Sequence, residues 1–142
     1  MRCKLNPVRW KRGTGEFLGF AVCAVILTVL MLAIMAFSNY STHDQQLSVA
    51  TYAAGRAAVV SSEPDLANAR AEAVLKTVYT DCLSSSPTGE LNQVWYTITY
   101  DGEWRIGNIA TITVYQHLGA IFPLTEQDIE CSIAMMIEDQ MD

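Results

Sequence analysis

The chain has 142 residues, of which 51% are hydrophobic, and its formal net charge is −6. This length allows at most one small domain plus an anchor, and the composition is too apolar for a disordered chain. After residue 16, fourteen acidic residues stand against four basic ones, a balance that disfavours binding to nucleic acid because phosphate would be repelled.

Basic residues gather at the start of the chain. Residues 1–16 hold five of the nine basic residues and one acid, Glu16, for a net charge of +4, whereas the remaining residues carry −10. Basic residues that flank a membrane span usually stay on the cytoplasmic side. We therefore expect a cytoplasmic basic tail at 1–16 and an extracytoplasmic head at 38–142.

Between them, residues 17–37 contain no charged side chain, and about 20 such residues are needed to cross the hydrocarbon core of a bilayer. The stretch predicts a single transmembrane helix in contact with membrane lipid. A cleaved secretory signal is the alternative, but its apolar region is about 7 to 15 residues long and is followed by an A-x-A site. Ala36-Phe37-Ser38 is the nearest approach to such a site.

The helical pattern continues beyond the span, so that one helix of roughly 65 Å is expected from about residue 16 to residue 60. The half of this helix beyond the membrane span is expected to pack against other protein surface. Small residues at Ala50, Ala54 and Ala57 permit close packing, either with this protein's own head or with a neighbouring subunit. Packing on the protein's own head is the preferred interpretation.

A second helix is expected to follow a break. Ser62 or Glu63 is placed near its N-cap, Pro64 fits the first turn, and an apolar stripe runs on to Cys82. The sequence SSSPTGE then predicts a solvated loop, because proline, glycine and consecutive serines disfavour a helix.

The last third of the chain changes to a period of two. Alternating residues predict strands at 94–100, within 109–116 and at 129–138, with Asp101-Gly102 as a hairpin turn. Helices followed by about three antiparallel strands define an α+β head.

Signatures of catalysis are not found. The two histidines, His43 and His117, have no carboxylate or thiolate at a metal-ligand spacing, and they are interpreted as exposed or turn residues. Neither the motifs of serine hydrolases and zinc peptidases nor a glycine-rich phosphate loop is present. We therefore expect a protein that is not an enzyme, with no cofactor, no metal and no small-molecule substrate.

Two features mark the membrane edge. Gly15 and Gly19 have the small-xxx-small spacing that lets transmembrane helices approach closely, although simple helix-end flexibility explains them equally well. Glu16 is costly beside lipid, so it is either an interfacial carboxylate in water or a functional residue.

Cysteines lie on both sides of the predicted membrane. Cys3 and Cys23 should stay reduced, whereas Cys82 and Cys131 are predicted to lie outside, on the apolar faces of the second helix and the last strand. We expect a disulfide between Cys82 and Cys131, with two buried free thiols as the alternative.

Taken in order, these segments resemble the TadE-like minor pseudopilins of tight-adherence (Tad/Flp) pilus systems. The resemblance covers nearly the whole chain. It rests on "RGTGEF" at the membrane edge, "AAGRAA" above it, and "ATITVYQHLGAIFPL" followed by an alternating strand that ends in Glu138.

The resemblance implies a pilin-like membrane junction at Gly13, Gly15, Glu16 and Phe17, and it gives Glu16 the role of neutralising a basic group of an adjacent subunit. In that family a prepilin peptidase cuts after a glycine five residues before the glutamate. Lys11 stands there in this chain, which predicts slow or absent processing with the span retained.

Two functions are compatible with this sequence. The first is a structural pilin-like subunit that associates with other pilin-like or assembly-platform subunits and assists a surface pilus, or a related secretion or conjugation apparatus. The second is a signal-anchored extracytoplasmic binding or accessory module of a transporter, receptor or envelope complex, which enters no filament.

Overall fold

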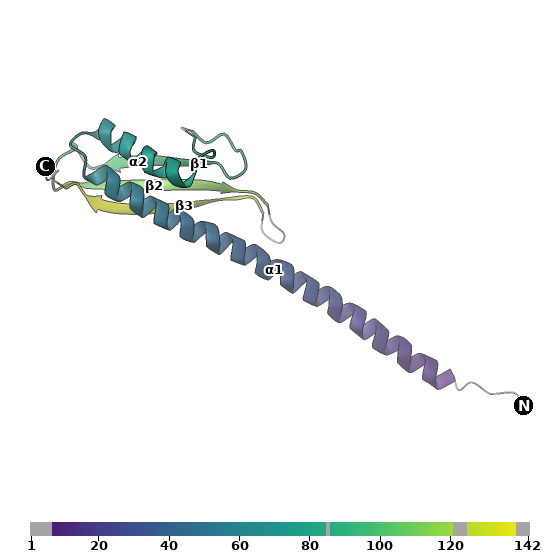
Figure 1. Cartoon of the computed structure of the whole chain (residues 1–142). Helices are drawn as coiled ribbons and strands as arrows, with labels where there is room; N and C mark the ends of the chain where they lie inside the picture. The colour runs from purple at the N-terminus through teal and green to yellow at the C-terminus, as the bar shows by residue number, and fades with distance from the viewer. Residues whose placement is uncertain (1–6, 85, 121–124, 139–142) are drawn as a thin grey trace, which may run out of the picture.

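The computed structural model describes residues 7–84, 86–120 and 125–138. It contains two helices and three strands in the order α1, α2, β1, β2, β3. Figure 1 shows α1 as one long rod whose C-terminal part carries α2 and the sheet, while its N-terminal part extends away from them. The predicted α+β architecture, with a long apolar helix before a second helix and three antiparallel strands, is confirmed.

Helix α1 runs from Pro7 to Val59, a length of about 80 Å at 1.5 Å per residue. Its described part begins nine residues before the expected start. Between residues 15 and 35 no side chain is buried. This is the one helix, among the described residues, that is long and apolar enough to cross a membrane.

The second half of α1 packs on the head. Its buried residues follow helical spacing and include Leu47, Ala50, Ala54 and Ala58. They join a core that also contains Ala67, Ala71 and Leu75 of α2 and the inward residues of the sheet. The alanine face therefore packs on the protein's own head, as the preferred interpretation held.

Helix α2 spans Pro64–Val78, with Glu63 at its N-cap and Pro64 at the first position. It ends four residues earlier than predicted. The Tyr79 backbone leaves helical geometry, and the chain then turns so that Cys82 and Ser84 exchange backbone hydrogen bonds with Val94. Cys82 therefore lies in the turn after α2 instead of on its apolar stripe.

The sheet has the order β1-β2-β3, with β1 at Val94–Tyr100, β2 at Ile109–Leu118 and β3 at Gln127–Met136. Both pairs are antiparallel. In the observed register Ile112 of β2 is paired with Ile98 of β1 on one side and with Ile133 of β3 on the other. Alternate residues of β2 from Ala110 to Leu118 are buried against the helices, while the intervening residues form the outer face.

The connection between β1 and β2 is longer than the predicted two-residue turn. It runs from residue 101 to 108, and Gly102 and Gly107 adopt positive φ angles of 76° and 90° that glycine tolerates best. Trp104 folds back from this connection, and its indole N–H donates a hydrogen bond of 2.8 Å to the Ser61 carbonyl oxygen. The connection is thereby tied to the end of α1.

Candidate functional site

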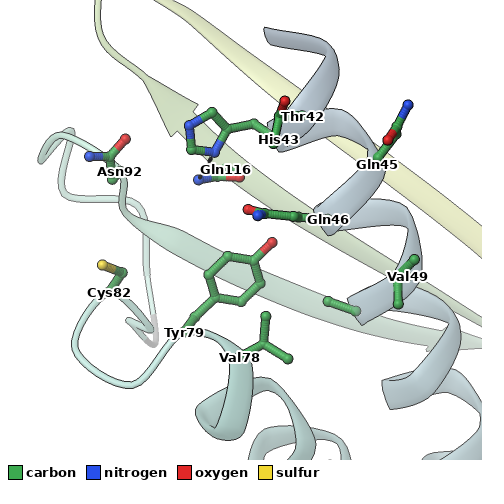
Figure 2. Close-up of a pocket in the computed structure, with 11 residues that line it drawn as sticks. Thr42, His43, Gln45, Gln46, Val49, Val78, Tyr79, Cys82, Asn92 and Gln116 are labelled. Carbon is green, nitrogen blue, oxygen red and sulfur yellow. Dashed lines mark hydrogen bonds between the residues drawn. The ribbon is translucent and has the colours of Figure 1, made fainter. Parts of the chain in front are cut away.

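A hollow lies between α1, the end of α2 and strand β2, and Figure 2 shows the side chains around it. Its volume is about 700 Å³. We call it the α1 hollow and define it by its lining residues, which are Thr42, His43, Gln45, Gln46, Val49, Ala50, Val78, Tyr79, Cys82, Asn92 and Gln116.

Three structural features place these side chains together. The α1 residues recur at three- and four-residue steps and so share one side of the helix. The chain leaves the helical path at Tyr79, whose ring extends from the end of α2 toward α1 (Figure 2). Gln116 occupies a position on β2 where the alternation directs its side chain toward the helices.

Gln116 is a polar residue in a core position, with 2% of its surface exposed. Its amide nitrogen lies 3.3 Å from Nδ1 of His43 and donates to that atom in the neutral tautomer with the proton on Nε2. Its carbonyl oxygen is buried and has no hydrogen-bond partner among the described residues. If the amide were turned over, the nitrogen would be left without a partner instead.

Tyr79 presents the second unpartnered group. The residue is 8% exposed, and its hydroxyl is buried without a hydrogen-bond partner in the described part of the chain. Burial raises the pKa of this phenol above its ordinary value. The hydroxyl therefore keeps its proton and is available as a hydrogen-bond donor.

Among the described residues, the lining of the α1 hollow includes no Asp, Glu, Lys or Arg. A charged ligand would lose hydration there without gaining a counter-charge. The described residues also include no group of three or more His, Cys, Asp and Glu side chains placed to hold a metal ion. The arrangement suits an uncharged group that accepts one hydrogen bond and donates another.

The residues predicted for the membrane junction and for helix packing are not brought together. Gly15, Glu16, Phe17 and Gly19 are exposed on the first half of α1, and a Cβ atom added at either glycine would meet no described atom within 4 Å apart from the neighbouring backbone of α1 itself. Gly13 lies in the backbone of α1. By contrast, Ala50 and Ala54 are buried in the head, and Ala57 is half-buried.

The predicted disulfide is not formed, because Cys82 and Cys131 are both free thiols. Residue 83 pairs with Val94 at the outer side of β1, whereas Cys131 lies on β3, two strands further across the sheet. Three strand spacings separate them by about 14 Å. Disulfide-bonded Cα atoms are about 4.4 to 6.8 Å apart, so the pair is out of reach.

Both histidines differ from the expected exposed residues. His43 is half-buried beside Gln116, and the His117 side chain is 16% exposed on the outer face of β2. His117 Nδ1 lies 2.6 Å from Asp128 Oδ1, and Nε2 lies 3.2 Å from Glu126 Oε1. These hydrogen bonds, first that to Asp128 and then that to Glu126, raise the pKa of His117.

Neither Gln116 nor Tyr79 was predicted as a site residue from the sequence. The signal for Gln116 was present, since it stands in the inward register of an otherwise apolar strand. Tyr79 had no comparable signal, because its position depends on where α2 ends. Comparison of the chain with known protein families, with characterised proteins and with solved structures finds no match.

Proposed function

We propose that this protein is a non-enzymatic, membrane-anchored, pilin-like subunit of the TadE-like kind, which assists assembly of a surface pilus or a related secretion or conjugation apparatus. One observation supports it most strongly. A single continuous helix is bare along its apolar half and packed into a small head along the other half.

The bare half needs an apolar environment. Residues 17–37 include fourteen large hydrophobic side chains that are at least 44% exposed. Burying each such side chain is worth about 1.5 to 3 kcal/mol relative to water, so the helix would be a strong driver of aggregation in solution. A bilayer supplies the missing environment, and residues 17–37 match its thickness.

The orientation follows from charge. The net charge of +4 before residue 17 stays in the cytoplasm, and the acidic head, with its net charge of −10, lies outside. In this arrangement α1 leaves the membrane near residue 37 and carries the head directly on its continuation. Such a rigid link transmits a force on the helix to the head, which suits a subunit that is moved by an assembly platform.

Glu16 is the residue at which assembly is best tested. It is exposed at the cytoplasmic end of the apolar stretch, where it can neutralise a basic group of an adjacent subunit or remain in interfacial water. Glu16→Gln should leave membrane insertion intact and reduce the amount of assembled product. Unchanged assembly would assign Glu16 to the interface alone.

The experiment that tests the function follows the fate of the anchor. Cells that make the full chain are sheared, and the filament fraction and the membrane fraction are analysed for it by intact mass. A pilin-like subunit should enter the sheared fraction with residues 17–37 still attached. Because Lys11 replaces the glycine of the cleavage site, the mass should correspond to an unprocessed or slowly processed N-terminus.

A second candidate function has its own observation. The α1 hollow, with the unpartnered Tyr79 hydroxyl and Gln116 oxygen, also suits a binding or accessory module that stays in the membrane beside a transporter, receptor or envelope complex. Such a module should remain entirely in the membrane fraction after shearing. Recovery of the chain in filaments would decide against it.

A further inference from the structure

The head covers α1 close to the end of the apolar stretch. Ala36 belongs to residues 17–37, yet only 1% of its surface is exposed. It borders a small cavity that is lined by residues of α1, of the end of β2 and of the start of β3, namely Ala36, Asn39, Tyr40, Leu118, Gly119, Thr125 and Gln127. Figure 1 shows this end of the sheet directed toward the bare half of α1. The head therefore reaches down to the last residues of the apolar stretch.

The length of the helix sets the level of this contact in a membrane. From Glu16, at the cytoplasmic end of the apolar stretch, to Ala36 the helix rises about 30 Å at 1.5 Å per residue. The hydrocarbon core of a bilayer is about 30 Å thick, and the headgroup layers extend it to about 40 to 45 Å. With Glu16 at the inner interface, Ala36 lies at the outer boundary of the hydrocarbon. The head residues beside Ala36 then lie at the level of the outer headgroups.

An exposed apolar side chain lies at this same end of the head. Leu91 is 69% exposed, and its side chain covers Gly119, where an added Cβ atom would collide with it. Ala120, the next residue along the chain, is exposed and uncharged. A single exposed leucine is ordinary on a protein surface. At the level of the headgroups, however, Leu91 adjoins acyl chains, and they can remove it from water.

Charge indicates the class of lipid. Residues 37–55 and 106–142 contain no Lys or Arg, so this end of the head offers no permanent cation to a lipid phosphate. Glu126 and Asp128 are exposed there, and His117, which contacts both, offsets part of their charge only when it is protonated. An anionic membrane surface repels these carboxylates, whereas the ammonium group of a zwitterionic headgroup attracts them.

We propose that the head rests on the outer surface of a bilayer of zwitterionic phospholipid through Leu91, Gly119, Ala120 and Thr125, which we call the lipid-facing surface. The inference rests on the proposed membrane anchoring, because α1 holds the head at this level. The contact also orients the head. The connection between β1 and β2, about 30 Å away along the ten residues of β2, points away from the membrane.

Fluorescence quenching in proteoliposomes tests the proposal. The full-length chain, with its native cysteines changed to serine, carries one NBD probe at Leu91→Cys or at Ala120→Cys. Phosphatidylcholine with a nitroxide on its headgroup should quench both probes. The matched control is Ile106→Cys, since Ile106 is 66% exposed but lies in the connection between β1 and β2. Its quenching should be at least about fivefold weaker, because it lies about 30 Å further along the sheet.

Variants and lipid composition separate this contact from chance proximity. Leu91→Glu should lower the quenching of the Ala120→Cys probe, because a charge is costly beside acyl chains. Ile106→Glu should leave that quenching unchanged. Both positions are exposed, so neither variant should lower the thermal midpoint of the solubilised chain. Replacing part of the phosphatidylcholine with phosphatidylglycerol should lower the quenching at Leu91→Cys, because the acidic end of the head is then repelled.

Several outcomes would overturn the proposal. These are equal quenching at Leu91→Cys and Ile106→Cys, quenching that rises with phosphatidylglycerol, and equal effects of Leu91→Glu and Ile106→Glu. A probe at Val29→Cys, within the apolar stretch, and a nitroxide deep in the acyl chains report the anchor separately. If Val29→Cys is quenched and Leu91→Cys is not, the chain is anchored and its head stands clear of the lipid. If Val29→Cys is not quenched, the anchor fails, and this proposal fails with it.

Discussion

Gly55 of α1 packs directly against Met135 of β3. A Cβ atom placed at Gly55 would lie 3.1 Å from the Met135 sulfur and 3.2 Å from Ile133 Cγ2. The helix therefore approaches the sheet more closely here than a bulky side chain permits. Because α1 is continuous, this contact helps to set the direction in which the apolar half leaves the head.

The first prediction concerns that contact. Gly55→Leu should lower the free energy of unfolding of the detergent-solubilised chain by about 1 to 3 kcal/mol, because the added atoms must displace the Met135 and Ile133 side chains. Chemical denaturation followed by circular dichroism measures the change. The control, Ala69→Leu at an exposed position of α2, should stay within about 0.5 kcal/mol of the parent. Equal losses in both variants would show that the close approach is unimportant.

The second prediction concerns the Tyr79 hydroxyl. Tyr79→Phe should leave the free energy of unfolding of the solubilised monomer unchanged or raise it by up to about 1 kcal/mol, because a buried hydroxyl without a partner does not stabilise the fold. Tyr96→Phe is the matched control, since its hydroxyl donates to the Asn68 carbonyl at 3.3 Å. That variant should lose about 0.5 to 1 kcal/mol. A larger loss at Tyr79 than at Tyr96 would mean that the Tyr79 hydroxyl is bonded within the monomer.

The third prediction is a pH dependence at His117. Hydrogen bonds to Asp128 and then to Glu126 raise its pKa in the folded chain. The resulting stabilisation is complete below the unfolded value of about 6.5 and is lost as the pH rises through the folded pKa. The thermal midpoint should therefore fall as the pH rises above about 6.5, and it should fall less in His117→Gln. If the thermal midpoint depends on pH equally in both proteins, His117 is not the cause of the dependence.

The fourth prediction is that Cys82 and Cys131 are free thiols in the purified chain. Chain purified without reductant should give freely alkylated Cys82 and Cys131 peptides in non-reducing mapping. In the folded chain iodoacetamide should modify the exposed Cys82 faster than the half-buried Cys131. A linked Cys82–Cys131 peptide would instead require β3 and the turn after α2 to lie much closer together.

The elements that sequence analysis placed well have strong local patterns. The period of two from Val94 to Tyr100 defines β1 to the residue, and Pro64 marks the start of α2. The end of α2 was missed because an apolar stripe continued to Cys82, whereas the chain gains backbone hydrogen bonds to Val94 by turning at Tyr79. A long-range contact of this kind has no signature within the helix itself.

The candidate site was harder to predict for the same reason. The α1 hollow combines residues from α1, the end of α2 and β2, so its existence depends on how three elements meet. Gln116 was recognisable as a polar residue in an inward register, but its amide nitrogen is partnered by His43, which is far away in sequence, and its oxygen has no partner among the described residues. The apolar stretch at 17–37, by contrast, needed no tertiary information.

The central claim is that α1 anchors the head on the outer side of a membrane, and cysteine labelling tests it most directly. Thr97, exposed on the outer face of β1, is replaced by cysteine in a full-length chain whose native cysteines are changed to serine. We predict that a membrane-impermeant maleimide labels Thr97→Cys on intact cells as fully as after permeabilisation. Labelling only after permeabilisation would place the head in the cytoplasm and contradict the proposed orientation.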